Sequence, residues 1–333
     1  MRAARRRGTA AGTPGPARGA SALYPPAMSP VLGLHHVTAI SGPAQETVDF
    51  YAARLGLRLV KQTVNFDDPG TYHLYFADGD AAPGSVMTFF PWTNAAPGRI
   101  GAGQATATAW AVPRGAVGAW AEQTDGGGVS ERFGDAVLTV HAPDGLVVEL
   151  VEADAPAGQW TGGGVPLDRA LGGFAGATLC SLAPDATARV LTDALGYREV
   201  GQEADRVRFV NERAPRAGTV DLYCSPFAQA GRMGTGTVHH VAFRVPDDEA
   251  EREVRERLRE LGLQPTGVID RQYFHSVYAR EPGGILFEIA TENPGFAVDE
   301  PADALGRALR LPPQYEPQRD DIRARLPELR LPY

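Results

Sequence analysis

Four copies of one strand–helix–strand pattern run through this chain of 333 residues. The first copy has an apolar strand over residues 33–40, a helix over 45–56 with apolar side chains at helical spacing, and three short strands. Further copies begin near residues 105, 176 and 237. Each unit can bury its apolar face only against another unit. The pattern therefore predicts an α+β fold made of four βαβββ units.

The units divide the chain into two predicted modules, over residues 31–153 and 174–292, separated by a segment rich in Gly, Pro and Ala. Residues 1–27 begin with basic residues and continue with Gly, Pro and Ala, so we expect a disordered N-terminal extension, with Met28 as an alternative translation start. Residues 293–333 form a C-terminal tail, which we expect to dock on the body of the protein or on a neighbouring molecule.

Composition narrows the classes of partner. The chain is 43% hydrophobic and 22% charged, as in soluble globular proteins. A formal net charge of -8 argues against nucleic acid or an anionic membrane as a partner. No apolar run is long enough to span a bilayer, and two cysteines are too few for a disulfide framework. We therefore expect a cytoplasmic protein that binds a small molecule; a homo-oligomer remains open.

Histidine is concentrated in two places. Four of the seven histidines lie in the pairs His35-His36 and His239-His240, on the first strands of the first and fourth units. Neighbouring side chains on a strand point to opposite faces, so one histidine of each pair is expected to enter a shared site. A lone strand histidine is usually structural. Two such pairs at equivalent repeat positions favour a metal site.

A carboxylate completes this candidate site. Glu288 lies in an apolar strand of the fourth unit, six residues after Pro282, and Glu149 follows Pro143 at the same spacing in the second unit. The first strands of the second and third units carry no histidine, so only Glu288 can join a two-histidine site. Two imidazoles and one carboxylate suit non-heme Fe(II), and Mn(II) accepts the same ligands.

Three alternatives stay open from the residues alone. Glu288 could instead pair with Arg271 or Arg280, because a buried carboxylate needs a partner. Tyr278 has Thr139 as its counterpart in the second unit, and it fits either a polar contact at the site or a place in the core. The aromatic residues Phe89, Phe90 and Trp92 fit the core better than a pocket wall.

Several segments together resemble one family: LHHVT at 34–38, GTVHHVAF at 236–243 and DRQYFHSVYAREPGGILFEIATENPGF at 270–296. They are similar to ring-cleaving dioxygenases that act on hydroquinones and chlorohydroquinones. These dioxygenases belong to the vicinal oxygen chelate superfamily, which also includes glyoxalases and bleomycin resistance proteins. The similarity extends over nearly the whole chain from Val31. The resemblance implies cup-shaped mixed β-sheets with flanking helices, and insertion of both atoms of O2 into an aromatic diol.

Carried over by position, the resemblance implies that His36, His240 and Glu288 bind Fe(II), or Mn(II). It places the following residues around substrate and oxygen: His35, Thr38, His239, Arg271 and Tyr278.

Three rival functions remain. A catechol-cleaving extradiol dioxygenase would take all three ligands from one module, yet the third unit lacks a histidine. A glyoxalase-type metal lyase would need a second carboxylate near His36, and the end of the first unit, Met87-Thr-Phe-Phe90, has none. A non-enzymatic binding module of the same fold would have no need of the two histidines and the carboxylate.

Overall fold

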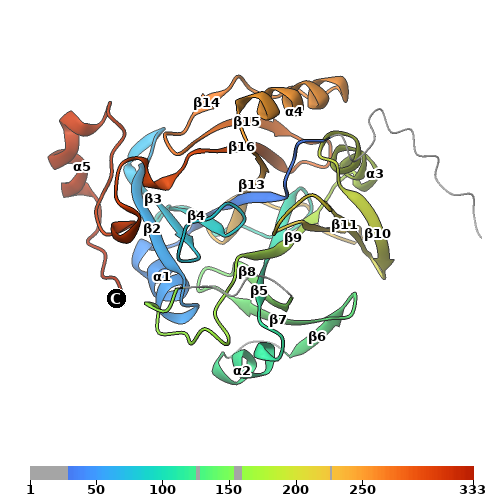
Figure 1. Cartoon of the computed structure of the whole chain (residues 1–333), viewed down its shortest axis with the longest axis horizontal. Helices are drawn as coiled ribbons and strands as arrows, with labels where there is room; N and C mark the ends of the chain where they lie inside the picture. The colour runs from blue at the N-terminus through green and yellow to red at the C-terminus, as the bar shows by residue number, and fades with distance from the viewer. Residues whose placement is uncertain (1–28, 125–127, 154–159, 226) are drawn as a thin grey trace, which may run out of the picture.

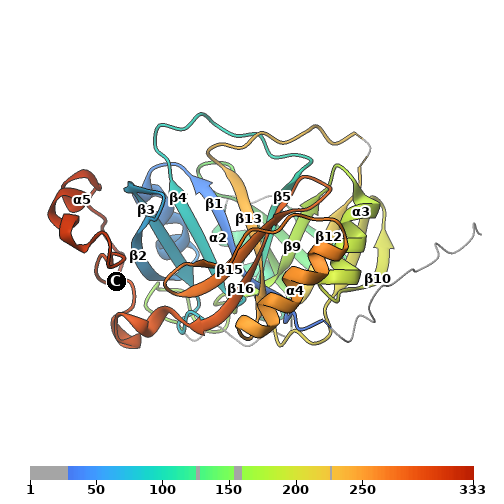
Figure 2. The same ribbon diagram turned by 90° about the horizontal axis from the view of Figure 1, so that it is seen from above.

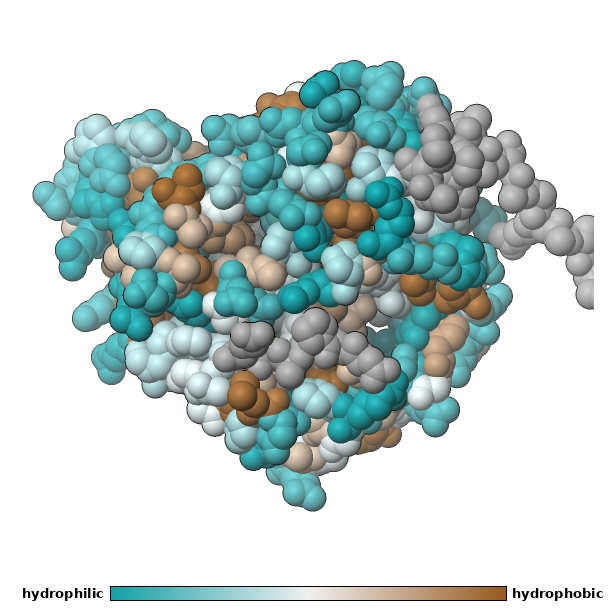
Figure 3. All heavy atoms as spheres, in the orientation of Figure 1, coloured by the Kyte–Doolittle hydropathy of each residue, from teal (hydrophilic) through white to brown (hydrophobic). Residues whose placement is uncertain are grey.

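The computed structural model describes residues 29–124, 128–153, 160–225 and 227–333 (Figure 1). The expected disordered extension, residues 1–27, lies outside the described residues. The described part of the chain contains no helix that is long and apolar enough to cross a membrane. Polar side chains cover most of the face seen in Figure 3, where apolar side chains occur only in small groups.

Each unit contains the expected strand and helix followed by three strands. The first unit comprises β1 (Leu34–Ser41), α1 (Ala44–Val48), which continues as the π-helix η2 (Asp49–Arg54), β2 (Arg58–Asn65), β3 (Asp68–Ala77) and β4 (Val86–Pro91). The second comprises β5 (Gln104–Val112), α2 (Ala116–Gln123), β6 (Val129–Arg132), β7 (Asp135–His141) and β8 (Val147–Glu152).

The second half of the chain repeats this order. The third unit comprises β9 (Phe174–Cys180), α3 (Pro184–Arg189) with the π-helix η3 (Val190–Ala194), β10 (Arg198–Glu203), β11 (Arg206–Val210) and β12 (Thr219–Tyr223). The fourth comprises β13 (Thr237–Val245), α4 (Asp248–Glu260), β14 (Ile269–Asp270), β15 (Phe274–Arg280) and β16 (Leu286–Pro294). A glycine follows the helix of the first, third and fourth units: Gly56, Gly196 and Gly262 have positive φ angles of 74°, 71° and 84°, which favour glycine.

The strands form two curved eight-stranded sheets, each drawing one unit from each half of the chain (Figure 2). The first sheet has the order β14-β15-β16-β13-β1-β4-β3-β2, and the second has the order β10-β11-β12-β9-β5-β8-β7-β6. Antiparallel pairs, β1 with β13 and β5 with β9, join the two units at the centre of each sheet. These mixed sheets confirm the expected α+β fold. The division into modules over 31–153 and 174–292 stays a prediction.

One buried apolar cluster runs through both sheets and under the helices. Phe89 belongs to it, with its ring 4.5 Å from that of Tyr51, and Trp110 packs 4.5 Å from Phe174 in the second half of the core. Helix α4 covers β15 and β16 from outside (Figure 2). The opposite, concave face of the first sheet is therefore left to form a site.

The C-terminal tail docks on the body of the protein, along the edge strand β2. It contains η4 (Phe296–Val298), η5 (Ala302–Ala304), η6 (Glu316–Gln318) and α5 (Arg319–Arg325), which lies beside β2 and β3 in Figure 1. The amide of Arg310 donates to the Gln62 carbonyl at 2.8 Å, and the Leu59 amide donates to the Tyr333 hydroxyl at 2.7 Å. The tail thus provides partners for backbone groups that an edge strand leaves exposed.

Candidate metal centre and pocket

Three neighbouring strands bring the predicted ligands together on the concave face of the first sheet. His36 of β1 is opposite Ala242 of β13, and Ala242 lies beside Glu288 of β16. His240 lies two residues before Ala242, so its side chain points to the same face. Residues more than 200 positions apart in sequence therefore converge because β1 and β13 pair at the centre of the sheet.

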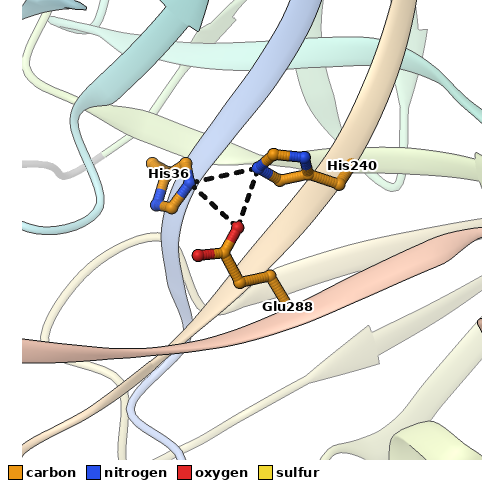
Figure 4. A group of neighbouring side chains, drawn as sticks. All are labelled: His36, His240 and Glu288. Carbon is orange, nitrogen blue, oxygen red and sulfur yellow. Dashed lines mark hydrogen bonds and ion pairs between the residues drawn. The ribbon is translucent and has the colours of Figure 1, made fainter. Parts of the chain in front are cut away.

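The three side chains point toward one another (Figure 4). His36 Nε2 lies 3.3 Å and His240 Nε2 lies 2.8 Å from Glu288 Oε2, and the two ring nitrogens are 3.3 Å apart. All three residues are buried, and the Glu288 side chain has no exposed surface. Within the described residues, this is the one cluster of histidines, cysteines and carboxylates compact enough to hold a metal ion.

The neighbouring histidines control which nitrogens face this cluster. His35 Nδ1 lies 2.9 Å from His36 Nδ1, and His239 Nδ1 lies 2.8 Å from His240 Nδ1. When each ligand histidine donates its Nδ1 proton to its neighbour, its Nε2 lone pair is left facing Glu288. Glu288 Oε1 has no hydrogen-bond partner in the described part of the chain. Buried lone pairs without a donor call for a cation, so these residues fit a metal ion.

Burial and mutual charge set the protonation states. Burial alone raises the pKa of Glu288, but the adjacent His36 and His240 outweigh it and hold the pKa well below its usual value. Burial lowers the pKa values of His240 and His35, and it lowers the pKa of His239 to about 4. At neutral pH Glu288 is therefore a carboxylate, and His35, His239 and His240 are neutral imidazoles. These are the forms in which carboxylates and imidazoles bind metals.

A cavity of about 390 Å³ opens beside His36 and His240 of this cluster. Of the residues expected around substrate, the cavity is lined by Thr38, His239, Arg271 and Tyr278. His35 is not among the lining residues; it lies behind His36 and packs 5.1 Å from the Phe274 ring. Phe90 and Trp92, expected in the core, line the cavity instead, with their rings stacked 6.0 Å apart.

Arg271 and Tyr278 form one polar group at the cavity wall. Arg271 Nε donates to the Tyr278 hydroxyl at 3.2 Å, and its guanidinium lies 5.2 Å from the centre of the Tyr278 ring. Burial raises the pKa of Tyr278, so its hydroxyl keeps its proton at neutral pH. Arg280 donates to the Gly284 carbonyl. Pairing of Glu288 with Arg271 or Arg280 is therefore wrong, because its partners are the two histidines.

Sequence reasoning missed a second polar chain along the cavity. The Tyr75 hydroxyl lies 2.9 Å from His73 Nδ1, His73 Nε2 lies 2.9 Å from Thr88 Oγ1, and Thr88 Oγ1 lies 2.8 Å from Thr38 Oγ1. Burial holds the pKa of His73 well below its usual value. Alternation along β3 places His73 and Tyr75 on one face, and that pattern in the sequence could have found them.

The second sheet holds no such centre at the equivalent place. Glu149 lies beside Ala109, as Glu288 lies beside Ala242, but Ala107 and Gly176 occupy the register positions of the two ligand histidines. Arg132 instead donates two hydrogen bonds to Glu149, at 2.8 and 2.6 Å. The Arg132 guanidinium thus neutralises the charge of the Glu149 carboxylate, which in the first sheet is the role proposed for a metal ion.

Comparison with known proteins identifies relatives of the whole described fold. The Bacillus subtilis protein MhqO, provisionally named a ring-cleaving dioxygenase, is 48% identical over 87% of this chain and 94% of its own length. The chlorohydroquinone/hydroquinone 1,2-dioxygenase of Sphingobium indicum is 34% identical over 88% of this chain and 95% of its own length. These likenesses confirm the prediction of a ring-cleaving dioxygenase, an enzyme that incorporates O2.

Solved structures agree with this assignment. A dioxygenase structure from Bacillus subtilis superposes with a TM-score of 0.88 at 46% identity, covering 91% of this chain and 99% of that one. Glyoxalase I from Zea mays superposes with a TM-score of 0.57 at 15% identity, covering 78% of this chain and 92% of that one, which is a likeness of fold alone. The model of the Glyoxalase/Bleomycin resistance protein/Dioxygenase superfamily matches residues 33–156 and 177–289, and the chain belongs to this superfamily.

Proposed function

We propose that this chain is an Fe(II)-dependent dioxygenase that opens the ring of a hydroquinone-type diol, with His36, His240 and Glu288 as its metal ligands. The observation that carries the proposal is the position of this cluster at the wall of an aromatic cavity, beside Arg271 and Tyr278. Three protein ligands leave further coordination positions for a diol and O2, and two imidazoles with one carboxylate suit Fe(II). Mn(II) accepts the same ligand set.

The chain's own residues would orient the substrate and handle its protons. An iron bound here would supply Lewis-acid activation of a diol hydroxyl and a route for electrons to O2. Phe90 and Trp92 pack against the flat ring of the diol. His239 lines the cavity as a neutral imidazole; because its Nδ1 accepts the proton of His240 Nδ1, its Nε2 carries a proton and can donate a hydrogen bond to a bound diol or to O2.

Negative charge that develops on the opened ring needs a stationary counter-charge. Arg271 supplies a permanent positive charge at the cavity wall, and Tyr278 supplies a protonated phenol that donates a hydrogen bond. His35 holds the His36 ring through the Nδ1 contact, so its proposed role is to orient a ligand from behind it.

The rival functions receive less support. A glyoxalase-type lyase needs a fourth ligand, whereas the cluster in the described residues has three, and the β4 residue beside His36 is Val86. A protein that only binds a small molecule would not need His36, His240 and Glu288 to form a cluster that can hold a metal ion. A catechol substrate fits the same metal chemistry, so the assay must separate catechols from hydroquinones.

The first test is oxygen uptake after anaerobic loading with Fe(II). We expect uptake with hydroquinone and chlorohydroquinone, little with catechol or 3-methylcatechol, and loss of at least about a thousandfold in Glu288→Gln, because a neutral amide is a poor ligand for the ion. Glu149→Gln is the matched control, since Glu149 has the same strand position in the second sheet and should keep both activity and bound iron.

Metal analysis accompanies the assay. Iron bound to the wild type and to Glu149→Gln, but not to Glu288→Gln, supports the assigned ligands. Uptake restricted to catechols would contradict the hydroquinone assignment. No uptake with any diphenol by protein that binds one iron per chain would contradict ring cleavage at this site.

A further inference from the structure

Lys61, on the edge strand β2, is a lysine with no exposed side-chain surface. Its ammonium donates to the Phe296 carbonyl at 2.9 Å and to Asp299 Oδ1 at 2.6 Å, and it pairs with Glu300 at 2.5 Å. It also lies 4.7 Å from the centre of the Tyr273 ring. A buried ammonium is stable only with partners of this kind, so Lys61 holds the start of the C-terminal tail firmly.

The second oxygen of Asp299 faces a turn that carries a cavity residue. Asp299 Oδ2 accepts hydrogen bonds from Gln272 Nε2 and from the Tyr273 hydroxyl, both at 3.0 Å. Gln272 has a φ of 68°, in the left-handed region that costs energy for residues other than glycine. Such a conformation persists only when surrounding contacts hold it, and Asp299 provides two of them.

Arg271 directly precedes Gln272 in this turn and lines the cavity. Its side chain donates to the Tyr278 hydroxyl at 3.2 Å, and its ion pair with Asp67 is long, at 3.9 Å. These side-chain contacts are weak, so the backbone of the turn largely decides where the guanidinium lies. The turn itself joins β14 to β15, at the edge of the sheet opposite β2.

We propose that Asp299, held by Lys61, is a positioning residue that fixes the turn over residues 271–273 and so places the Arg271 guanidinium against the diol. This inference rests on the proposed function, in which Arg271 faces the substrate. The tail is then part of the active site's support, because Asp299 joins Lys61 of β2, at one edge of the sheet, to the turn beside β14, at the other edge. Asp299 contacts Lys61 on β2 and also Gln272 and Tyr273 in the turn after β14, so it binds both edges of the sheet at once.

A double-mutant cycle tests the proposal with metal-loaded full-length enzyme. Asp299→Ala should lower kcat/KM for the diol about ten- to a hundredfold, as expected when a group is misplaced by about 1 Å. In an Arg271→Gln background the same change should have little further effect, because a residue that acts through Arg271 cannot act without it. Tyr273→Phe, which removes one hydrogen bond to Asp299, should give a smaller loss with the same dependence.

The matched control is Tyr333→Phe, which removes a different contact between the tail and β2 and leaves the turn untouched. It should keep kcat/KM in both backgrounds. Amide hydrogen exchange over residues 269–275 supplies a readout without turnover, and exchange should be faster in Asp299→Ala but not in Tyr333→Phe.

The outcomes separate the two proposals. An equal loss from Asp299→Ala with and without Arg271 would overturn the positioning role, as would full activity and unchanged exchange in Asp299→Ala. A wild type that consumes no O2 with any diphenol, or an Arg271→Gln variant with full activity, would contradict the proposed function. In that case, exchange at the turn still decides whether Asp299 holds it.

Discussion

At the residue scale, the hydrogen bonds that join Tyr75, His73, Thr88 and Thr38 allow a specific prediction. Thr88→Val keeps the shape of the side chain but leaves His73 Nε2 and Thr38 Oγ1 without their shared partner. Losing such buried hydrogen bonds costs about 1–3 kcal/mol, so we expect a lower free energy of unfolding and a fall in kcat/KM. Urea unfolding and steady-state oxygen uptake measure the two effects.

Thr63 offers a matched control for this change. It is buried on β2, opposite His73 in register, and its hydroxyl has no hydrogen-bond partner in the described residues. Thr63→Val should therefore leave stability and kcat/KM unchanged or slightly improved. Equal losses in both variants would mean that the hydroxyl of Thr88 has no special role.

At the element scale, helix α4, which covers β15 and β16, carries a buried carboxylate, that of Glu251. Glu251 is buried, and neither of its oxygens has a hydrogen-bond partner in the described part of the chain. Burial, helped by the nearby Asp248, raises its pKa from 4.5 to about 7. A raised carboxyl pKa means that stability from this group is complete below pH 4.5 and is lost as the pH rises through about 7.

Glu251→Gln should therefore gain stability over the wild type as the pH rises from 5 to 8. We expect the difference in free energy of unfolding to grow by on the order of 2 kcal/mol across that range. Denaturant unfolding at the two pH values measures it. The exposed Glu249→Gln, on the same turn of α4, should show no such trend, and an identical trend there would refute the assignment to Glu251.

The elements themselves differ in how well local sequence predicts them. β1 and β13 are apolar and lie in the centre of a sheet; β1 lies within one residue of the strand expected over 33–40, and β13 begins where the fourth unit was expected to begin, near residue 237. β6 and β10 were expected from the repeat but could not be located from their own residues, because they are mostly exposed edge strands without apolar alternation. β14 has only two residues and carries no periodic signal.

At the scale of the whole molecule, the tail protects the open edge of the first sheet. Removing residues 308–333 would free the Leu59 amide and the Gln62 carbonyl and would expose Val64, which is buried against Leu311 and Ile322 of the tail. We expect a thermal midpoint lower by about 5 °C or more and association through β2. Calorimetry and light scattering test this, and a truncated chain that stays monomeric with an unchanged midpoint would contradict it.

By itself, the sequence determined the repeat of four units and favoured Glu288 over the second-unit Glu149 as the carboxylate beside the two histidine pairs, whereas the choice of His36 and His240 within those pairs came from the family resemblance. These features depend on local periodicity and on side-chain chemistry, which neighbouring residues carry. Only the tertiary structure decided that units from opposite halves share each sheet, that the Thr88 hydroxyl links His73 to Thr38, and that Lys61 meets Asp299. Those contacts join strands and loops far apart in the chain, so packing and strand pairing settle them, and no local pattern encodes them.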